Sequence, residues 1–365
     1  MKMLSTGRGL SSFLQLLATA TGTAVLVLLF AINLQSQPST SRQVTVTPSA
    51  ADYAAAAAAR NVRVHLRPAN TPVGRKTSVA AISNSPAGTG KQNTAAAPDS
   101  GVPRFPADLE FHGGNVVVSM QQVAIYMNPN GACTIASCWG DPEGFLSDLG
   151  MSSFIHVVDQ YTSSTADDRY TVAGTHVMIN YKPNAAPFTD ADMRAIVHAV
   201  AAALGTPNGY GNEFHVFLPP GQDECFNLGF KVCYSPDDLK TFFFCAYHSS
   251  ADFSDIGHVL YSVEPFQDNF GCSSRPGTPN GQLADSTNNV LSHEVFETIT
   301  DPDGTAWWNS LDNGIFGEEI GDECSFLLFT NTAVFFDPSD VTLNNKSYVA
   351  QPEYNNNQHA CTTSP

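Results

Sequence analysis

The composition of the chain changes sharply near residue 105, and this change limits where a hydrophobic core can form. Before it, Ala, Ser, Thr, Pro, Gln and Asn dominate, and aromatic residues are scarce. Such a composition offers too little apolar surface to offset the entropy lost on folding. We therefore predict a disordered linker over residues 35–104 and one folded domain over residues 105–365, within the usual size range of domains.

An apolar segment precedes the linker. Residues 13–34 carry no charge and follow Lys2 and Arg8. About 20 such residues span a bilayer as a helix, and the small-x-small cleavage pattern at Ala31–Asn33 is poor. We favour a signal anchor over a cleavable signal peptide. Residues 1–12 would then be cytoplasmic, because positive charge stays inside. The later domain would lie outside, either anchored to the membrane or secreted.

The predicted domain is strongly acidic. Of the 17 Lys and Arg residues, ten precede residue 105, so seven basic residues remain against 32 acidic ones. Affinity for nucleic acid comes mainly from Lys and Arg, so this balance argues against a nucleic-acid partner. We interpret the acidity as a solubility feature in preference to a calcium-binding surface.

All eight cysteines fall within the predicted domain. An even number of cysteines behind an export signal favours disulfides, and the absence of any CxxC pair argues against thiolate zinc. The pairing stays open, although Cys361 is a candidate to tie the C-terminal tail to Cys324. The disulfide candidates are Cys133, Cys138, Cys225, Cys233, Cys245, Cys272, Cys324 and Cys361.

Short β-type runs and two helices predict an α+β domain, in which helices pack on a mixed β-sheet. The first helix should start at Thr189, with Asp192 completing a capping box, and stop at Gly205. The second should start near residues 285–287 and end before Asp301-Pro302. The expected strands cover residues 115–127, 153–159, 170–181, 213–218, 241–247 and 258–263.

The second helix carries the residues best suited to chemistry. His293 and Glu297 are one turn apart and share a face opposite the apolar stripe of Leu291, Val295 and Ile299. This spacing is that of HExxH zinc peptidases, in which two ligands hold the metal and the intervening Glu, here Glu294, acts on water. The second His is replaced by Glu297, which is a permitted zinc ligand.

Further ligand candidates follow the helix. We expect Glu319 to supply a third metal ligand, and Asp301 and Asp322 to support the site as nearby carboxylates, with Asp322 orienting His293. The plain alternative is that this face of the helix is a solvated surface. His112 and His248 could approach the metal from neighbouring strands, although each alone is more often a structural histidine.

Several motifs resemble the conserved region of Exordium-like, phosphate-induced proteins. The resemblance rests on the helix and turn over residues 291–302, the pair Trp307-Trp308, and the segment Glu319–Cys324. Earlier pieces fit as well: residues 111–114, 145–149, 244–248 and 279–281. It implies a secreted or cell-surface protein with a zincin-like (metallopeptidase-type) domain and no settled activity. The long anchor and linker, and Phe296 in place of a small residue, depart from the family's pattern.

Two functions remain open from the sequence. The first is a zinc-dependent hydrolase, in particular a peptidase, that acts outside the membrane through Glu294. The second is a non-enzymatic surface protein in which the same carboxylates bind a structural metal such as calcium, while an exposed face recognises a peptide or a cell-wall polymer.

Overall fold

The computed structural model describes residues 42–69, 108–128, 133–181, 187–226, 231–309, 319–327, 334–335 and 339–365, all within one unit, Arg42–Pro365. The predicted membrane segment and the residues before it lie outside these ranges. None of the helices within the described ranges is both long and apolar enough to cross a bilayer.

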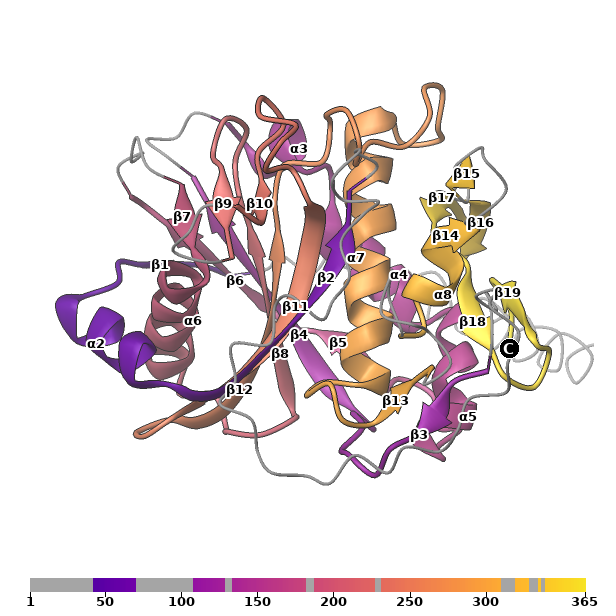
Figure 1. Cartoon of the computed structure of the whole chain (residues 1–365), viewed down its shortest axis with the longest axis horizontal. Helices are drawn as coiled ribbons and strands as arrows, with labels where there is room; N and C mark the ends of the chain where they lie inside the picture. The colour runs from indigo at the N-terminus through magenta and orange to yellow at the C-terminus, as the bar shows by residue number, and fades with distance from the viewer. Residues whose placement is uncertain are drawn as a thin grey trace, which may run out of the picture. The chain divides into compact units, whose positions relative to one another are not determined.

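A mixed eight-stranded sheet forms the centre of this unit, as the sequence predicted (Figure 1). The order across the sheet is β1 (Arg42–Val46), β6 (Thr175–Ile179), β4 (Met120–Met127), β8 (Asn212–Phe217), β12 (Gly257–Glu264), β11 (Phe244–Phe253) and β2 (Arg60–Pro68). Neighbouring strands are parallel from β1 to β12, and β11 runs antiparallel to both of its neighbours. Strand β5 (Tyr170–Val172) pairs with β4 outside this path.

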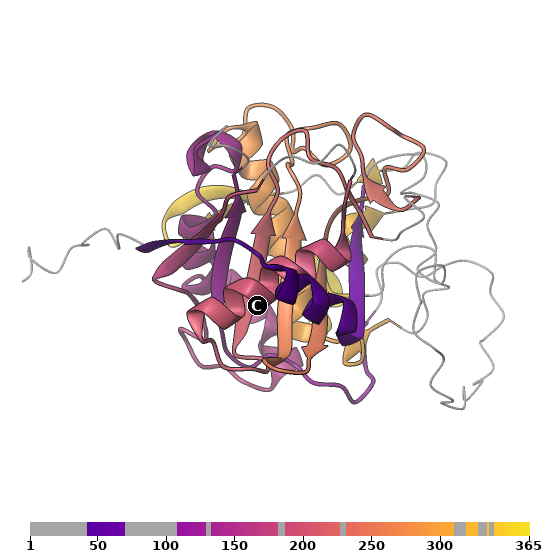
Figure 2. The ribbon, with the colours of Figure 1, turned by 90° about the vertical axis from the view of Figure 1, so that its left-hand side faces the viewer.

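Helices cover both faces of the sheet and bury two separate apolar clusters. On one face lie α2 (Ala50–Ala58) and α6 (Asp190–Leu204), which Figure 2 shows in front of the strands. On the other lie α7 (Gln282–Thr300) and α4 (Pro142–Gly150). Because side chains alternate along a strand, β4, β6, β8 and β12 contribute to both clusters.

The expectation of a disordered linker over residues 35–104 is wrong for residues 42–69. These residues form β1, α2 and β2, and two of these elements are strands of the central sheet. Strand β2 pairs with β11 along most of its length, and Ala56 of α2 packs in the cluster under α6. A low content of large apolar residues was a poor guide here, because edge strands and a short Ala helix need only one apolar side.

The helix predictions are largely confirmed. Helix α6 begins after Thr189, whose backbone N–H donates to Asp192 (2.8 Å), and ends at Gly205 with φ of 63°. Helix α7 begins at Gln282, earlier than predicted, and ends at Thr300. The expected strand over residues 153–159 is instead a 3₁₀-helix, η4 (Phe154–Val158). A short apolar run does not by itself distinguish a strand from a buried helical turn.

Short elements complete the unit. The helical ones are α3 (Ile135–Cys138), α5 (Asp159–Thr162) and α8 (Asp322–Ser325). The small strands are β3 (Glu110–Phe111), β7 (Phe188–Thr189), β9 (Glu224–Cys225), β10 (Cys233–Tyr234), β13 (Trp307–Trp308), β14 (Phe326–Leu327), β15 (Val334–Phe335), β16 (Ser339–Leu343), β17 (Lys346–Ala350), β18 (Glu353–Asn355) and β19 (Ala360–Thr362).

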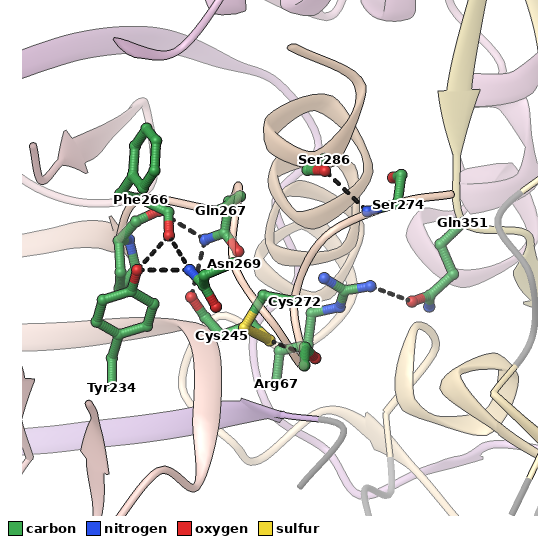
Figure 3. Close-up of a disulfide and its surroundings, with 12 residues drawn as sticks. Arg67, Tyr234, Cys245, Phe266, Gln267, Asn269, Cys272, Ser274, Ser286 and Gln351 are labelled. Carbon is green, nitrogen blue, oxygen red and sulfur yellow. Dashed lines mark hydrogen bonds between the residues drawn. A yellow bond between two sulfur atoms is a disulfide. The ribbon is translucent and has the colours of Figure 1, made fainter. Parts of the chain in front are cut away.

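All eight cysteines form disulfides. The pairs are Cys133–Cys138, Cys225–Cys233, Cys245–Cys272 and Cys324–Cys361, and the last pair ties the tail as the sequence suggested. The bond from Cys245 links β11 to the segment that leads into α7 (Figure 3). Within that segment the backbone N–H of Ser274 donates to Ser286 of α7 (2.8 Å). The disulfide thus helps to fix α7 against the sheet.

Candidate metal centre

Helix α7 is buried on all sides from Asp285 to Thr300, although it is rich in polar residues. Leu291, Val295 and Ile299 pack in the apolar cluster with α4, as the predicted stripe requires. Other positions face the sheet, where Thr298 donates a hydrogen bond to Glu213 of β8 (2.7 Å). The solvated-face alternative does not hold for the motif residues, since His293, Glu294 and Glu297 are at most 1% exposed.

The sheet presents polar side chains to α7. Val62, Val64 and Leu66 of β2 pack toward the α6 side, so the alternate residues of that strand face the other way. The same alternation on β8, β12 and β11 places ionisable and hydroxyl side chains between the sheet and α7. The set comprises His65, Arg67, Glu213, His215, His248, Ser250, Ser262 and Glu264.

His293, Glu297 and Asp322 form one group of metal-ligand type. His293 Nε2 lies 3.0 Å from Glu297 Oε1 and 3.7 Å from Asp322 Oδ1. The three ligand atoms lie within 4.8 Å of one another, and all three residues are buried. A tetrahedral zinc ion with bonds of about 2.0–2.2 Å separates its ligand atoms by about 3.3–3.6 Å. The two separations measured from His293 Nε2 bracket that range.

His65, His248 and Glu319 form a second group of the same kind. Glu319 Oε2 lies 3.1 Å from His65 Nδ1 and 3.1 Å from His248 Nε2. The two imidazole rings stack with centroids 4.9 Å apart. Two imidazoles and one carboxylate are the protein ligands of several catalytic zinc and iron sites.

The two groups are adjacent, and they divide the predicted ligands differently from the sequence interpretation. His248 Nε2, which contacts Glu319, is also 3.7 Å from Glu297 Oε2. Asp322, expected only to support the site, places a carboxylate oxygen beside His293 and so belongs to the first ligand group. Glu319 instead contacts His65 and His248 in the second group. The predicted residues His293, Glu297, Glu319 and Asp322 therefore meet in one region, as members of two groups.

Glu294 is fully buried and carries no hydrogen bond on either carboxylate oxygen within the described part of the chain. Burial, followed by the negative charge of Glu264, raises its pKa well above the ordinary value, while the Arg67 guanidinium opposes the shift. A buried carboxyl with a raised pKa and no fixed partner has the properties expected of a general base or acid.

Asp301 lies just after the C-terminus of α7. Among the described residues, only one of its two carboxylate oxygens accepts hydrogen bonds. Its Oδ1 accepts hydrogen bonds from the backbone N–H groups of Thr305 (2.6 Å) and Ala306 (2.7 Å). Its Oδ2 has no hydrogen-bond partner among the described residues. Burial and the charge of Glu319 raise the pKa of Asp301 to about 8. Asp301 thus holds the turn after the helix.

The two ligand groups and Glu294 together form one cluster, which contains more acidic than basic side chains. Burial and the charges of Asp322 and Glu319 raise the pKa of Glu297 well above its usual range. Burial opposes ionisation of Glu319 as well, but His65 and His248 lower its pKa below the ordinary value. Burial lowers the pKa of His293 and of His248, so both imidazoles favour the neutral form that binds metals. Bound cations would offset the excess of buried negative charge.

Gln351 connects His293 to Arg67. The Gln351 side-chain nitrogen lies 3.1 Å from His293 Nδ1, and its oxygen accepts from Arg67 (3.2 Å; Figure 3). This contact occupies the far nitrogen of the ring and directs Nε2 toward Glu297. If the Gln351 nitrogen donates to Nδ1, the ring proton is on Nε2. A cation on Nε2 would move that proton to Nδ1, where the amide would have to present its oxygen.

Two glycines sit directly against the histidines. A Cβ at Gly321 would lie 2.5 Å from His293 Nδ1 and 3.0 Å from Glu297 Oε1. A Cβ at Gly304, which has φ of 63°, would lie 2.2 Å from His65 Nε2. Any larger residue at either position would displace a ligand-type side chain. The backbone therefore fits closely around both groups.

His65 is the residue of the cluster that the sequence interpretation missed, because it lies in the supposed linker. Its signal was present in residues 60–67, where Val62, Val64 and Leu66 alternate with polar residues in the period of a strand. His248 joins the cluster, as one reading of the sequence allowed. His112 does not, since its ring stacks on Trp308 with centroids 3.5 Å apart.

A separate cavity of about 480 Å³ opens elsewhere, near the ends of β8 and β12. Pro220, Asp223, Asp237, Phe266 and Asp268 are among its lining residues, and none of the cluster histidines lines it. Comparison of the chain with models of known families, with curated proteins and with solved structures found no match. The geometry of the cluster therefore carries the functional argument.

Proposed function

We propose that the chain is an exported zinc-dependent hydrolase with a zincin-like domain, and that peptides are its substrates. The observation that carries this proposal is the convergence of His293, Glu297 and Asp322, from α7 and α8, within 4.8 Å in a buried region. A mixed set of nitrogen and oxygen ligands suits zinc. Calcium takes oxygen ligands alone, so histidine in both groups favours zinc.

The residues would divide the work as follows. His293, Glu297 and Asp322 would hold the ion, and Gln351 would keep the His293 ring in position. Zinc, when bound, supplies Lewis acidity and activates water. Glu294 would take up and return a proton during hydrolysis, which its burial and its lack of a hydrogen-bond partner support.

A structural metal is the second candidate function, and burial is the observation that favours it. His293 and Glu294 are fully buried, as ligands of a closed structural site usually are. In that case the protein would be a non-enzymatic surface protein that recognises a peptide or a cell-wall polymer. Hydrolysis distinguishes the two candidates.

The proposed location is outside the cell, either anchored to the membrane through residues 13–34 or secreted. Four disulfides support this location, because disulfides persist in oxidising compartments. Membership of the Exordium-like group stays a proposal that rests on the motifs in residues 291–302 and 319–324.

The test is the variant Glu294→Gln in the purified protein loaded with zinc. We expect wild type to cleave unfolded peptides, and the variant to lose at least about 100-fold in kcat, as is typical when a general base is removed. Its zinc content, measured by elemental analysis, should equal that of wild type. Glu213→Gln is the matched control, because Glu213 is also fully buried on the side facing α7 but contacts Thr298.

The possible outcomes separate the claims. Equal cleavage by the Glu294→Gln variant and wild type would remove Glu294 from the chemistry. Zinc binding without hydrolysis by wild type would favour the structural candidate. A protein that binds no zinc would contradict the proposal altogether.

A further inference from the structure

The two oxygens of Glu297 face two different imidazoles. Oε1 lies 3.0 Å from His293 Nε2, and Oε2 lies 3.7 Å from His248 Nε2. A carboxylate that directs one oxygen into each of two neighbouring ligand groups has the geometry of a bridging ligand. Glu297 is 1% exposed, so surrounding atoms hold it in this position.

Each ligand group is sufficient for an ion of its own. The group on α7 and α8 offers His293, Glu297 and Asp322, and the group on β2 and β11 offers His65 and His248 with Glu319. A tetrahedral zinc ion takes four ligands, so a single ion cannot use six residues. With Glu297 shared between them, one ion would have three protein ligands and one open position, and the other would have four protein ligands.

An unpartnered buried oxygen also points to the second group as a site. Glu319 is 2% exposed, and its Oε1 has no hydrogen-bond partner among the described residues. Burying an unpaired carboxylate oxygen is costly, and a cation that bound both Glu319 oxygens beside the two strand histidines would remove that cost. This observation does not depend on the His293 group.

We propose that this centre binds two divalent transition-metal ions, one held by His293 and Asp322, the other by His65, His248 and Glu319, with Glu297 bridging them. This inference rests on the proposed metal centre and adds the second ion. Paired metal sites in hydrolases place their ions about 3.5–4 Å apart, a distance that one carboxylate can span.

The experiment counts ions on the purified full chain. After saturation with zinc and removal of excess by gel filtration, elemental analysis should find two zinc ions per chain. His65→Ala and Asp322→Asn should each reduce the count to one, because each removes a ligand from one group. His112→Ala is the control and should retain two, since this histidine stacks on Trp308 outside the cluster.

A second measurement does not depend on any variant folding correctly. Manganese-loaded wild type should give the electron paramagnetic resonance spectrum of two spin-coupled ions, as a bridging carboxylate requires. Circular dichroism would check that each variant is folded. Substitution of His65 should disturb folding little, because its side chain is 24% exposed.

The results separate this inference from the proposed function. Two ions in wild type with a coupled spectrum support the pair. One zinc ion per chain at saturation, or an uncoupled manganese spectrum, overturns the pair and leaves a mononuclear hydrolase standing. A folded His65→Ala variant that still holds two ions overturns the assignment of the second group. No bound metal overturns both.

Discussion

Replacing Gly321 by alanine tests the centre with a single methyl group. The added Cβ would lie 2.5 Å from His293 Nδ1, 2.8 Å from its Cε1 and 3.0 Å from Glu297 Oε1. Ordinary contact begins at about 3.4 Å, the separation of well-packed atoms. To restore that distance, the imidazole or the backbone around position 321 must move by about 0.9 Å from its present place.

A shift of that size is large for a metal site. Ligand distances in such sites hold to within about 0.2 Å, and changes beside a ligand typically cost 10- to 100-fold in metal affinity. We therefore expect Gly321→Ala to raise the Kd for zinc by at least about 10-fold. Overpacking should also lower the free energy of unfolding without metal by about 1–3 kcal/mol.

Zinc affinity would be measured by competition with a chromophoric chelator, and stability by urea unfolding in the presence of a chelator. Gly211→Ala is the matched control, because a Cβ there meets no atom within 4 Å. The control should bind zinc as wild type does. If Gly321→Ala also binds zinc within about twofold of wild type, either His293 is not a ligand or the backbone around Gly321 does not pack against it.

Two further predictions concern stability. Removing the Cys245–Cys272 disulfide by double alanine substitution should lower the free energy of unfolding by about 3.5 kcal/mol, because its sequence separation is 27. Removing Cys133–Cys138, with a separation of 5, should lower it by about 2 kcal/mol. Equal losses in urea unfolding would contradict the dependence on loop length. Burial raises the pKa of Glu224 well above its ordinary value. The folded state therefore holds this proton at a pH where the unfolded chain has lost it, and wild type should lose stability relative to Glu224→Gln as pH rises above about 4.5. Unfolding midpoints of the two proteins that keep a constant difference from pH 4 to pH 8 would show that the carboxyl is not held this way.

Local patterns in the sequence were enough to predict helix α7, which carries His293, Glu294 and Glu297, and to predict which of its faces packs in the core. The stripe of Leu291, Val295 and Ile299 lies in the core with α4, and His293 and Glu297 share another face. Capping chemistry placed both ends of α6 correctly. These predictions succeeded because they depend on contacts within about one turn of the chain.

Amino-acid composition was a poor guide to structure where a segment pairs with residues that are distant in the sequence. The segment around His65 contains few large apolar residues, yet β2 is a strand of the sheet because β11 offers it hydrogen bonds and α7 covers its polar side. The alternation in residues 60–67 was the better guide, since a strand at the edge of a sheet needs one apolar face and not an apolar composition.

The sequence by itself therefore determined the helix, its motif and the presence of an even set of cysteines. Only the tertiary structure decided which acids and histidines meet. Asp322 lies beside His293, and Glu319 lies between His65 and His248, although the last two are 183 positions apart in the chain. The physical reason is that ligand distances of a few ångströms are set by how β2, β11, α7 and α8 pack together, and no local pattern encodes that packing.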